Sequence, residues 1–316
     1  MGKKRFITVL LSVLLAVGST FAQQKIVFVP NWTAQAQFAG FYVADALGFY
    51  KEAGLDVVIR HPTTSQNSFE WLKSGECQFA SLQLVSAITF MSRGGKAVNV
   101  LQYFQQNGQM IISHKPLKGL NSLNGMRIGR FLSGASLLPL AVVNKHQLQV
   151  EWIPFLSQTN LFISGAIDAT LAMNYNEYYQ LLNAGQRLQP SQLLYMRDVG
   201  YNVPDDGLYV SADFYRAHPA EVKKFVEATK KGWEWAVAHP KETVDYVMFY
   251  VRQNGVASNA KTQTWMLNEC LKLLKHPKTG KRTYRLDTQT VDQVNRILLE
   301  GGVIKRAIPY QQLTKP

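Results

Sequence analysis

The stretch "NWTAQAQFAGFYVADALGFYKEAGLDVVI" (residues 31–59) follows the short apolar run "KIVFVP" (25–30), and together they decide the fold. The apolar run predicts a buried strand, and residues 39–53, which end before Gly54, predict a helix. "LDVVIR" (55–60) predicts a second strand, so the stretch is a strand–helix–strand unit of an α/β fold. Residues 31–38 bring amides and aromatic rings to the carboxyl end of the first strand. In open α/β sheets ligands bind at such strand ends, so we expect a ligand there.

The rest of the first two thirds of the chain alternates short predicted strands with helices, which indicates α/β layers around a mostly parallel sheet. One internal echo supports two similar lobes. "LKSGECQFASL" (72–82) and "FISGAIDATLA" (162–172) share Ser-Gly-x-x-(Gln/Asp)-x-Ala at an offset of 90 residues. Each copy reads as a helix end, a glycine and a buried strand.

After Asp205 the pattern becomes helical, with helices predicted within 219–240 and over 240–253, 259–274 and 287–300. We expect this helical tail to pack on the first lobe and its tryptophans to be core side chains. The predicted division is a signal peptide over 1–22, lobe 1 over 23–112 and 208–316, and lobe 2 over 113–207. The chain would cross between the lobes near 111–115 and near 204–209.

The first residues have the pattern of a secretory signal. Lys3, Lys4 and Arg5 precede an apolar run over 6–17, and small residues stand at Thr20 and Ala22. The run is too short for a retained anchor helix, which needs about 20 apolar residues. We therefore expect cleavage after Ala22 and a periplasmic mature protein. No cysteine lies near the cleavage site, so a lipid anchor on the mature N-terminus is not expected.

The formal net charge is +13, but the basic residues are spread along the chain, and no nucleic-acid role is expected. The densest basic cluster, "KHPKTGKR" (275–282), predicts a solvated loop. Cys77 and Cys270 are the only cysteines, and we expect two buried free thiols, although an oxidising compartment would permit a disulfide. No metal-ligand spacing, dinucleotide fingerprint, phosphate loop or Gly-x-Ser-x-Gly is present, so no metal or cofactor is predicted.

Side chains at the predicted strand ends form a candidate ligand site. Two aromatics, several amides and one carboxylate suit a flat, polar heterocycle stacked between rings, and Glu177 would accept hydrogen bonds from an amine or ring N–H. The alternatives are core burial for Trp32, an exposed charge at a helix start for Glu177, and helix capping for Ser133. The predicted ligand-binding residues are Asn31, Trp32, Gln37, Phe38, Gln83, Ser133, Asn174, Tyr175 and Glu177.

The opening motif resembles periplasmic solute-binding proteins of ABC transporters, in the sulfonate, nitrate and thiamine-pyrimidine-precursor family. That family has "A-G-x-Y-x-A-x-x-x-G-x-Y-x-x-x-G-L-D-V", which residues 39–57 match. "SLNGMRIGR" (122–130) is similar to its second-lobe strand, with Met126 where lysine is usual, and "SGAIDA" (164–169) and "NYNEYY" (174–179) resemble its later strand and binding loop. The resemblance implies a type II periplasmic-binding-protein fold, in which two α/β lobes joined by two crossings close around a ligand.

Within that family, Trp32 after Asn31 together with Asn176-Glu177 looks most like the branch that binds thiamine pyrimidine precursors. That branch stacks an aminopyrimidine on aromatic rings and holds its amine with a glutamate, so the likeness implies those roles for Trp32, Tyr175 and Glu177. It also implies an importer permease in the inner membrane as partner and a monomeric receptor. The alternative ligand is a sulfonate, nitrate or another small anion. "NVPDDG" (202–207) departs from the branch, and Asp205 and Asp206 either alter specificity or start the return crossing.

A eukaryotic pyrimidine synthase shares this fold, so an enzyme must be weighed. Its relatives carry a lysine and a histidine four residues apart after the third strand, and the corresponding positions here are Leu82 and Ser86. Leucine cannot form a Schiff base and serine cannot replace an imidazole, so we expect no enzymatic activity.

Overall fold

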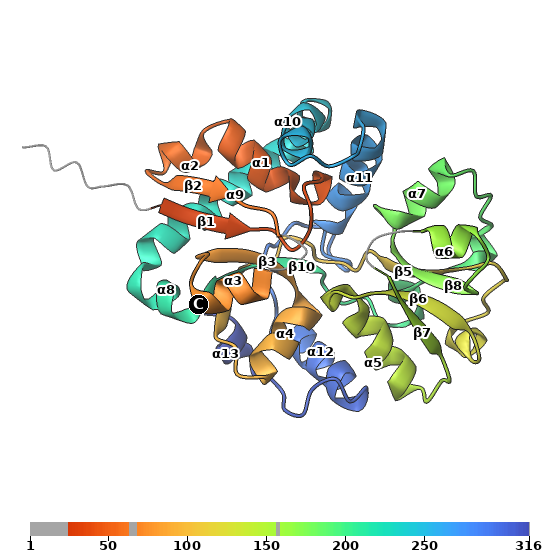
Figure 1. Ribbon diagram of the computed structural model, residues 1–316. Coiled ribbons are helices and arrows are strands. Elements are labelled where there is room, and N and C mark those ends of the chain that lie inside the picture. The colour runs from red at the N-terminus through yellow and green to blue at the C-terminus, as the bar shows by residue number, and fades with distance from the viewer. Residues whose placement is uncertain (1–24, 63–67, 156–158, 316) are drawn as a thin grey trace, which may run out of the picture.

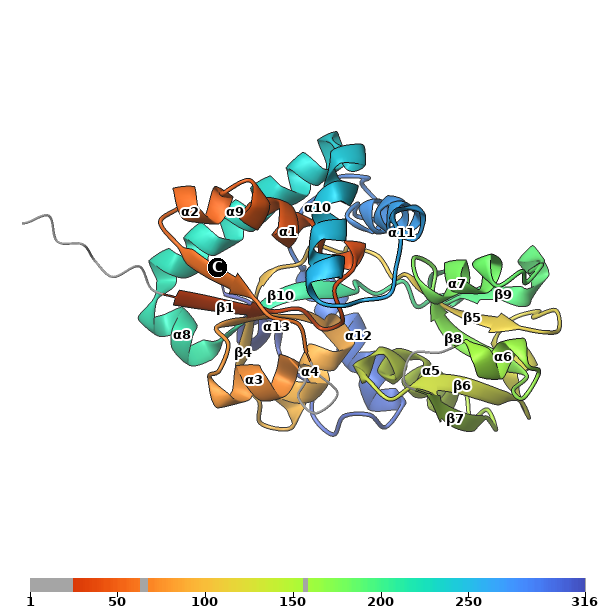
Figure 2. The ribbon, with the colours of Figure 1, turned by 45° about the horizontal axis from the view of Figure 1, so that its top comes forward.

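The computed structural model describes residues 25–62, 68–155 and 159–315, and these form two five-stranded mixed sheets side by side (Figures 1 and 2). The first sheet has the order β2-β1-β3-β10-β4 and the second the order β7-β6-β8-β5-β9. In both, the fourth strand of that order, β10 or β5, runs antiparallel to its two neighbours. The strands are β1 (Lys25–Val29), β2 (Asp56–Ile59), β3 (Phe79–Gln83), β4 (Ala97–Leu101), β5 (Gln109–Ser113), β6 (Arg127–Phe131), β7 (Glu151–Phe155), β8 (Ala169–Met173), β9 (Leu193–Tyr195) and β10 (Asp206–Ser211).

Helices cover both faces of the first sheet, with α1, α2, α9 and α10 on one side and α3, α4 and α13 on the other (Figures 1 and 2). The predicted α/β class with two lobes is therefore confirmed. The helices are α1 (Ala39–Ala46), α2 (Phe49–Glu52), α3 (Ser68–Ser74), α4 (Leu84–Ser92), α5 (Leu137–Lys145), α6 (Asn160–Ile163), α7 (Glu177–Asn183), α8 (Ala212–Ala217), α9 (Pro219–Ala238), α10 (Pro240–Gln253), α11 (Ala260–Leu273), α12 (Thr288–Glu300) and α13 (Tyr310–Leu313).

The internal echo marks equivalent elements of the two sheets. Its first copy contains the end of α3 and strand β3, and its second copy contains the end of α6 and strand β8. Both strands are fully buried and occupy the third place in their sheets. The repeated sequence therefore encodes a repeated layer, as predicted.

The predicted single helix over 39–53 is wrong, because the chain breaks it into α1 and α2. Gly48 lies between them with φ +76°, a left-handed conformation that glycine adopts without a steric penalty. The break turns Tyr50 into the core, where its ring stacks on Phe225 of α9 at 4.8 Å between centroids. The C-terminal helices agree with the predicted ranges.

The first crossing between the sheets comes earlier than predicted. β5 pairs with β8 and β9 of the second sheet, so the crossing lies between Leu101 and Gln109 and not at 111–115. The apolar run 109–113 is buried on both faces, and a sequence pattern cannot show which sheet buries it. The return crossing ends where β10 begins at Asp206, inside the predicted 204–209. We assign lobe 1 to residues 25–101 and 206–315 and lobe 2 to residues 109–195.

The helical tail packs on lobe 1, as predicted, and it also reaches lobe 2. α9 and α10 cover α1 in lobe 1, but α12 lies against α5 of lobe 2 as well as against α4. Lys145 Nζ of α5 pairs with Glu300 Oε2 of α12 at 2.9 Å, and Asn144 Nδ2 donates to the Gly301 carbonyl at 3.1 Å. α12 is therefore in contact with both lobes.

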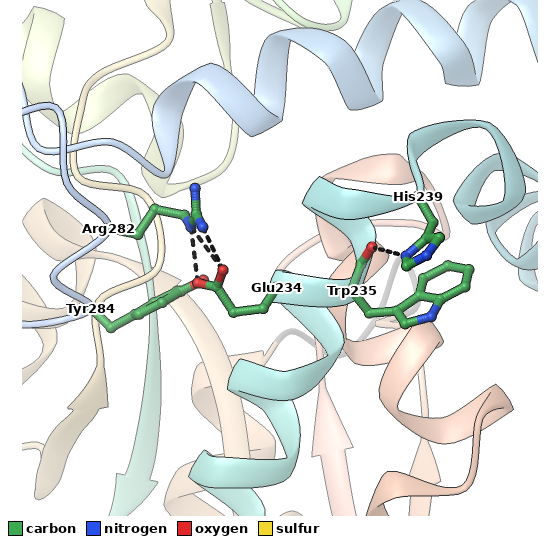
Figure 3. A network of polar contacts seen from close by, with 5 residues as sticks. All are labelled: Glu234, Trp235, His239, Arg282 and Tyr284. Carbon is green, nitrogen blue, oxygen red and sulfur yellow. Dashed lines mark hydrogen bonds and ion pairs between the residues drawn. The ribbon is translucent and has the colours of Figure 1, made fainter.

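Arg282, at the end of the basic cluster 275–282, is tied to α9 (Figure 3). It donates from Nε to Glu234 Oε1 at 2.9 Å, and the Tyr284 hydroxyl donates to the same oxygen at 2.7 Å. The pairing with Arg282 lowers the pKa of Glu234. The other basic residues of the cluster are exposed or half-buried, as predicted for a solvated loop.

Three further expectations concern cysteines, membrane spans and the signal. Cys77 and Cys270 are both buried and free, as predicted. Among the described residues, no helix combines the length and apolar character that a membrane crossing needs. The predicted signal peptide, 1–22, lies outside the described residues.

Candidate ligand-binding site

A cavity of about 200 Å³ lies between the lobes, at the carboxyl ends of β1, β3, β6 and β8. Seven of the nine predicted residues line it. Lobe 1 contributes Asn31, Trp32, Gln37 and Gln83, and lobe 2 contributes Ser133, Tyr175 and Glu177. The strand-end rule therefore located the cavity, because equivalent strands of both sheets end facing it.

Two predicted residues, Phe38 and Asn174, do not line the cavity. Phe38 is fully buried in lobe 1, where its ring packs against Tyr42 and His61. It belongs to the short 3₁₀ helix η1 (Ala36–Phe38), which turns this side chain into the core. Asn174 is not a lining residue, and its Nδ2 donates to Glu269 Oε2 at 3.1 Å. The next three residues, Tyr175, Asn176 and Glu177, all line the cavity.

The aromatic wall is larger than the sequence indicated. Trp32 is half-buried rather than a core side chain, and its ring meets Phe131 of lobe 2 edge-on, with centroids 6.4 Å apart and planes at 82°. Phe69 and Tyr175 add further rings to the lining. Phe131 is the last residue of β6, so the strand-end argument that selected Trp32 would also have found it. These rings offer flat apolar surfaces on both sides of the cavity.

Glu177 is the only acidic residue among the lining residues that the structure describes, and it is 3% exposed. The expected alternative, an exposed charge at a helix start, is therefore wrong. Its Oε2 accepts from the Met173 backbone N–H at 2.9 Å and its Oε1 from Asn176 Nδ2 at 2.8 Å. Burial raises the pKa of Glu177 to about 7 despite these hydrogen bonds. A carboxylate offers about four lone pairs, so a place for a ligand donor remains.

Ser133 has the capping role that we had weighed as its alternative, and it also lines the cavity. Its hydroxyl accepts from the Ala135 backbone N–H at 3.4 Å, at the start of a short 3₁₀ turn that leads into α5. The adjacent Gly134 lies so close to lobe 1 that an added Cβ would stand 2.2 Å from Ser86 Oγ. The two lobes are thus in contact at the cavity edge.

Asp206 stands directly behind the lobe-1 wall and is fully buried. Its Oδ1 accepts from Asn31 Nδ2 at 2.8 Å, and its Oδ2 accepts from Gln37 Nε2. It also begins β10, so of the two roles weighed for this segment it starts the return strand while contacting residues of the site. Burial raises the pKa of Asp206 to about 6.

Its neighbour Asp205 is buried as well. Burial, followed by the adjacent Asp206 carboxylate, raises the pKa of Asp205 well above its ordinary value. Two carboxylates this close oppose each other's ionisation, so the neighbouring Asp206 adds to the effect of burial on Asp205.

The cavity lining contains no lysine, arginine or histidine among the residues that the structure describes. Nor do the described residues bring three or more metal-ligating side chains together. The lining instead combines aromatic rings, the amides of Asn31, Gln35, Gln37, Gln83 and Asn176, and one carboxylate. Such a set suits a neutral or weakly basic ligand that donates hydrogen bonds.

These buried carboxylates predict that the free protein loses stability as the pH rises. Burial raises the pKa of Glu177 from 4.5 to about 7 and the pKa of Asp206 from 3.8 to about 6 in the folded state. The native state therefore holds protons that the unfolded chain releases, so the free energy of unfolding is highest at the acid end of this window and falls between about pH 4 and 7. We expect a loss on the order of 3 kcal/mol from Glu177. Thermal melts at pH 5.5 and 7.5 should show about half of this loss, because the unfolded chain already releases the proton below pH 5.5.

The matched control for this pH effect is Glu177→Gln, which cannot titrate. Its melting temperature should change less between the two pH values than that of the wild type. If the melting temperatures of the two proteins changed equally between these pH values, the effect could not be assigned to Glu177.

Sequence comparison finds relatives along most of the chain. The family model "NMT1/THI5 like" matches residues 35–243. Riboflavin-binding protein RibY of Chloroflexus aurantiacus is 25% identical over 304 residues, which cover 92% of this chain and 84% of RibY. 4-amino-5-hydroxymethyl-2-methylpyrimidine phosphate synthase THI12 of Saccharomyces cerevisiae is 23% identical, covering 76% of this chain and 75% of THI12. A formylaminopyrimidine-binding protein of Halalkalibacterium halodurans is 24% identical, covering 69% and 68%.

Structural comparison agrees with the expected fold. The periplasmic aliphatic sulphonate binding protein SsuA from Escherichia coli superposes with a TM-score of 0.67 at 11% identity, covering 93% of this chain and 98% of SsuA. This likeness shows a periplasmic-binding-protein fold, as the sequence resemblance predicted. Since the family model matches more than half of the chain, and matches the motif that opens it, the protein belongs to the NMT1/THI5-like family.

Proposed function

We propose that this protein is an extracytoplasmic solute-binding protein of an ABC importer, and that it captures a small aminopyrimidine, a thiamine precursor of the hydroxymethylpyrimidine type. It would deliver this ligand as a monomer to a permease in the inner membrane. Relatives of the same family are named for binding riboflavin and formylaminopyrimidine, and one of the similar folds is a periplasmic binding protein.

One observation carries the choice of ligand class: the cavity lining combines a buried carboxylate with aromatic rings, and its described residues include no basic side chain. An amine or ring N–H would donate to Glu177, while the ring would lie against Trp32 and Tyr175. A sulfonate or nitrate would meet that carboxylate without a cation to offset it. The volume of about 200 Å³ also favours a single ring over a three-ring flavin, because pockets for drug-sized ligands measure about 300–1,000 Å³.

The family also contains synthases, and two lining residues bear on that alternative. Leu82 and Ser86 line the cavity. They stand at the positions that correspond to the lysine and the histidine of the synthases. Neither side chain supplies an amine nucleophile or an imidazole, which supports binding without chemistry.

A thermal-shift screen tests the proposal with the purified mature protein and 4-amino-5-hydroxymethyl-2-methylpyrimidine, riboflavin, taurine, alkanesulfonates and nitrate. A ligand at 100 times its Kd adds about 2.7 kcal/mol of stability. For a protein of this size we expect the aminopyrimidine to raise Tm by about 5–10 °C. If only the sulfonates stabilised the protein, the proposed aminopyrimidine ligand would be wrong and the alternative, a small anion, would be supported.

We also propose that residues 1–22 direct export. Mass spectrometry of the protein recovered from the periplasm should give a mature N-terminus at Gln23. Recovery of a protein that retains Met1 in the cytoplasmic fraction would contradict the assignment of a signal peptide.

Closure around the ligand should depend on a contact between α11 of lobe 1 and α7 of lobe 2, which lie next to each other in Figures 1 and 2. The Trp265 ring stacks on Tyr179 at 4.7 Å and 11°, and its Nε1 donates to the Asn174 carbonyl at 3.2 Å. Trp265→Ala removes both contacts from the closed form, so we expect about 10-fold weaker aminopyrimidine binding by calorimetry.

The matched control is Trp235→Ala. Trp235 of α9 stacks on His239 (Figure 3), and its ring also meets Tyr246 of α10, so both ring contacts are within lobe 1. This variant should bind as the wild type does. Equal affinities for Trp265→Ala and the wild type would show that the contact between α11 and α7 does not contribute to closure.

A further inference from the structure

Asp206 does not line the cavity, but it contacts two side chains that do. Fully buried behind the wall, it accepts hydrogen bonds from the amide nitrogens of Asn31 and Gln37. Strand pairing holds it in place, because β10 lies between β3 and β4 and Asp206 pairs with Gln83 in register. Its backbone carbonyl accepts from the Phe104 N–H at 3.0 Å. The carboxylate therefore has little freedom to turn.

An ionised carboxylate accepts hydrogen bonds and cannot donate them. Both amides must therefore turn their NH₂ groups toward Asp206, since the opposite orientation would place a carbonyl oxygen against a buried negative charge. The orientation of each amide thus follows from the charge behind it. Asn31 Oδ1 is then free to accept from the Ser81 hydroxyl, which lies at 3.3 Å.

The same constraint passes on to a third amide. With its nitrogen on Asp206, Gln37 turns Oε1 toward Gln35, whose Nε2 donates to it at 2.5 Å. Gln35 Oε1 then has no donor among the described residues, and Gln35 lines the cavity. The row Asp206–Gln37–Gln35 therefore ends in an unpaired carbonyl oxygen in the cavity lining. Opposite it, lobe 2 contributes another acceptor, Glu177.

We propose that Asp206 is a specificity-determining positioning residue, which fixes the amides of the lobe-1 wall so that the cavity selects ligands with an amine edge and rejects their oxo counterparts. This inference rests on the proposed function and sharpens its ligand class. An exocyclic NH₂ satisfies the Gln35 or Glu177 oxygen, whereas an oxo group in the same place would set two acceptors against each other. Sites built to pair with a particular polar group discriminate strongly against ligands that leave it unpaired.

The decisive probes are 4-amino-5-hydroxymethyl-2-methylpyrimidine and its 4-oxo analogue, titrated at pH 8 into the wild type and Asp206→Asn. In the wild type we expect the amino compound to bind about 100-fold more tightly. An asparagine at 206 can donate to Gln37 Oε1, which lets Gln37 and Gln35 reverse and present an N–H to the ligand. The ratio of affinities should then fall below about 10-fold, partly through tighter binding of the oxo compound.

If Asp206→Asn only loosened the packing, both probes would bind more weakly by the same factor. The ratio of their affinities would then be unchanged, and that result would overturn the proposal. Asp45→Asn is the matched control, because Asp45 accepts from Tyr250 and does not contact the cavity; its ratio should equal that of the wild type. Gln35→Met tests the other end of the row if Asp206→Asn does not fold. This variant lacks the terminal carbonyl oxygen, so the ratio of its affinities for the amino and oxo compounds should also fall. An unchanged ratio would show that the row Asp206–Gln37–Gln35 does not set the preference. A wild type that binds neither pyrimidine would refute the proposed function itself.

Discussion

Replacing Glu177 with glutamine should weaken binding of the aminopyrimidine by about 10- to 100-fold at pH 8, where the wild-type carboxylate is ionised. Glutamine keeps the shape of the side chain but replaces a charged double acceptor with one neutral oxygen and one NH₂. A hydrogen bond to a charged group contributes about 1.5–3 kcal/mol, and this contribution is lost in the variant. Isothermal titration calorimetry would measure the loss directly.

The pH dependence of binding distinguishes this role from a general loosening of the site. A ligand that donates to the carboxylate binds the ionised form, so wild-type affinity should rise as the pH increases through about 7. In Glu177→Gln that contribution to the pH dependence should be absent. Glu52→Gln, an exposed change on α2, should bind like the wild type. Equal affinity of Glu177→Gln and the wild type at pH 8 would show that the carboxylate does not hold the ligand.

Gly232→Ala should lower the free energy of unfolding by about 2–3 kcal/mol, even though alanine favours a helix by about 1 kcal/mol over glycine. An alanine Cβ at this position of α9 would lie 2.0 Å from the Gly40 carbonyl oxygen and 2.9 Å from the Ala44 Cβ, both in α1. Neither helix can make room without moving, because Gly40 itself packs against the Trp233 ring. Thermal melts should show Tm lower by about 5–10 °C.

Lys231→Ala is the control for this stability prediction. It changes the neighbouring exposed position of the same helix, so it tests helix propensity without the contact to α1. Its Tm should stay close to that of the wild type. A Gly232→Ala protein as stable as the wild type would mean that α1 and α9 separate at little cost.

The contact between Gly40 and Trp233 also explains part of the motif that marks the family. From the sequence, Ala39-Gly40 was only a pattern shared with relatives, and the reason for the glycine was not visible. The reason lies 193 residues further along the chain, where the Trp233 ring lies within 2.3 Å of where a Gly40 Cβ would stand. Local sequence cannot reveal such a partner.

Much of the candidate site was predictable because strands of one sheet end at a common edge. Asn31, Trp32 and Gln83 followed from that rule, and so did Tyr175 and Glu177 in the second lobe. Phe38 and Asn174 do not line the cavity, since the rule gives the end of a strand but not the side to which each following residue turns. Asp206 was noticed only as a departure from related sequences, and its contact with Asn31 spans 175 positions.

The sequence by itself determined the alternation of strands and helices, the repeated layer of β3 and β8, and the edge at which the cavity lies. These depend on periodicity and on short-range signals, which neighbouring residues carry. Only the tertiary structure decided where the chain crosses between lobes, that α12 contacts both of them, and that Asp206 stands behind the amides of the wall. Each of these depends on which distant segment removes a side chain from water, and burial of that kind is a property of the assembled lobes.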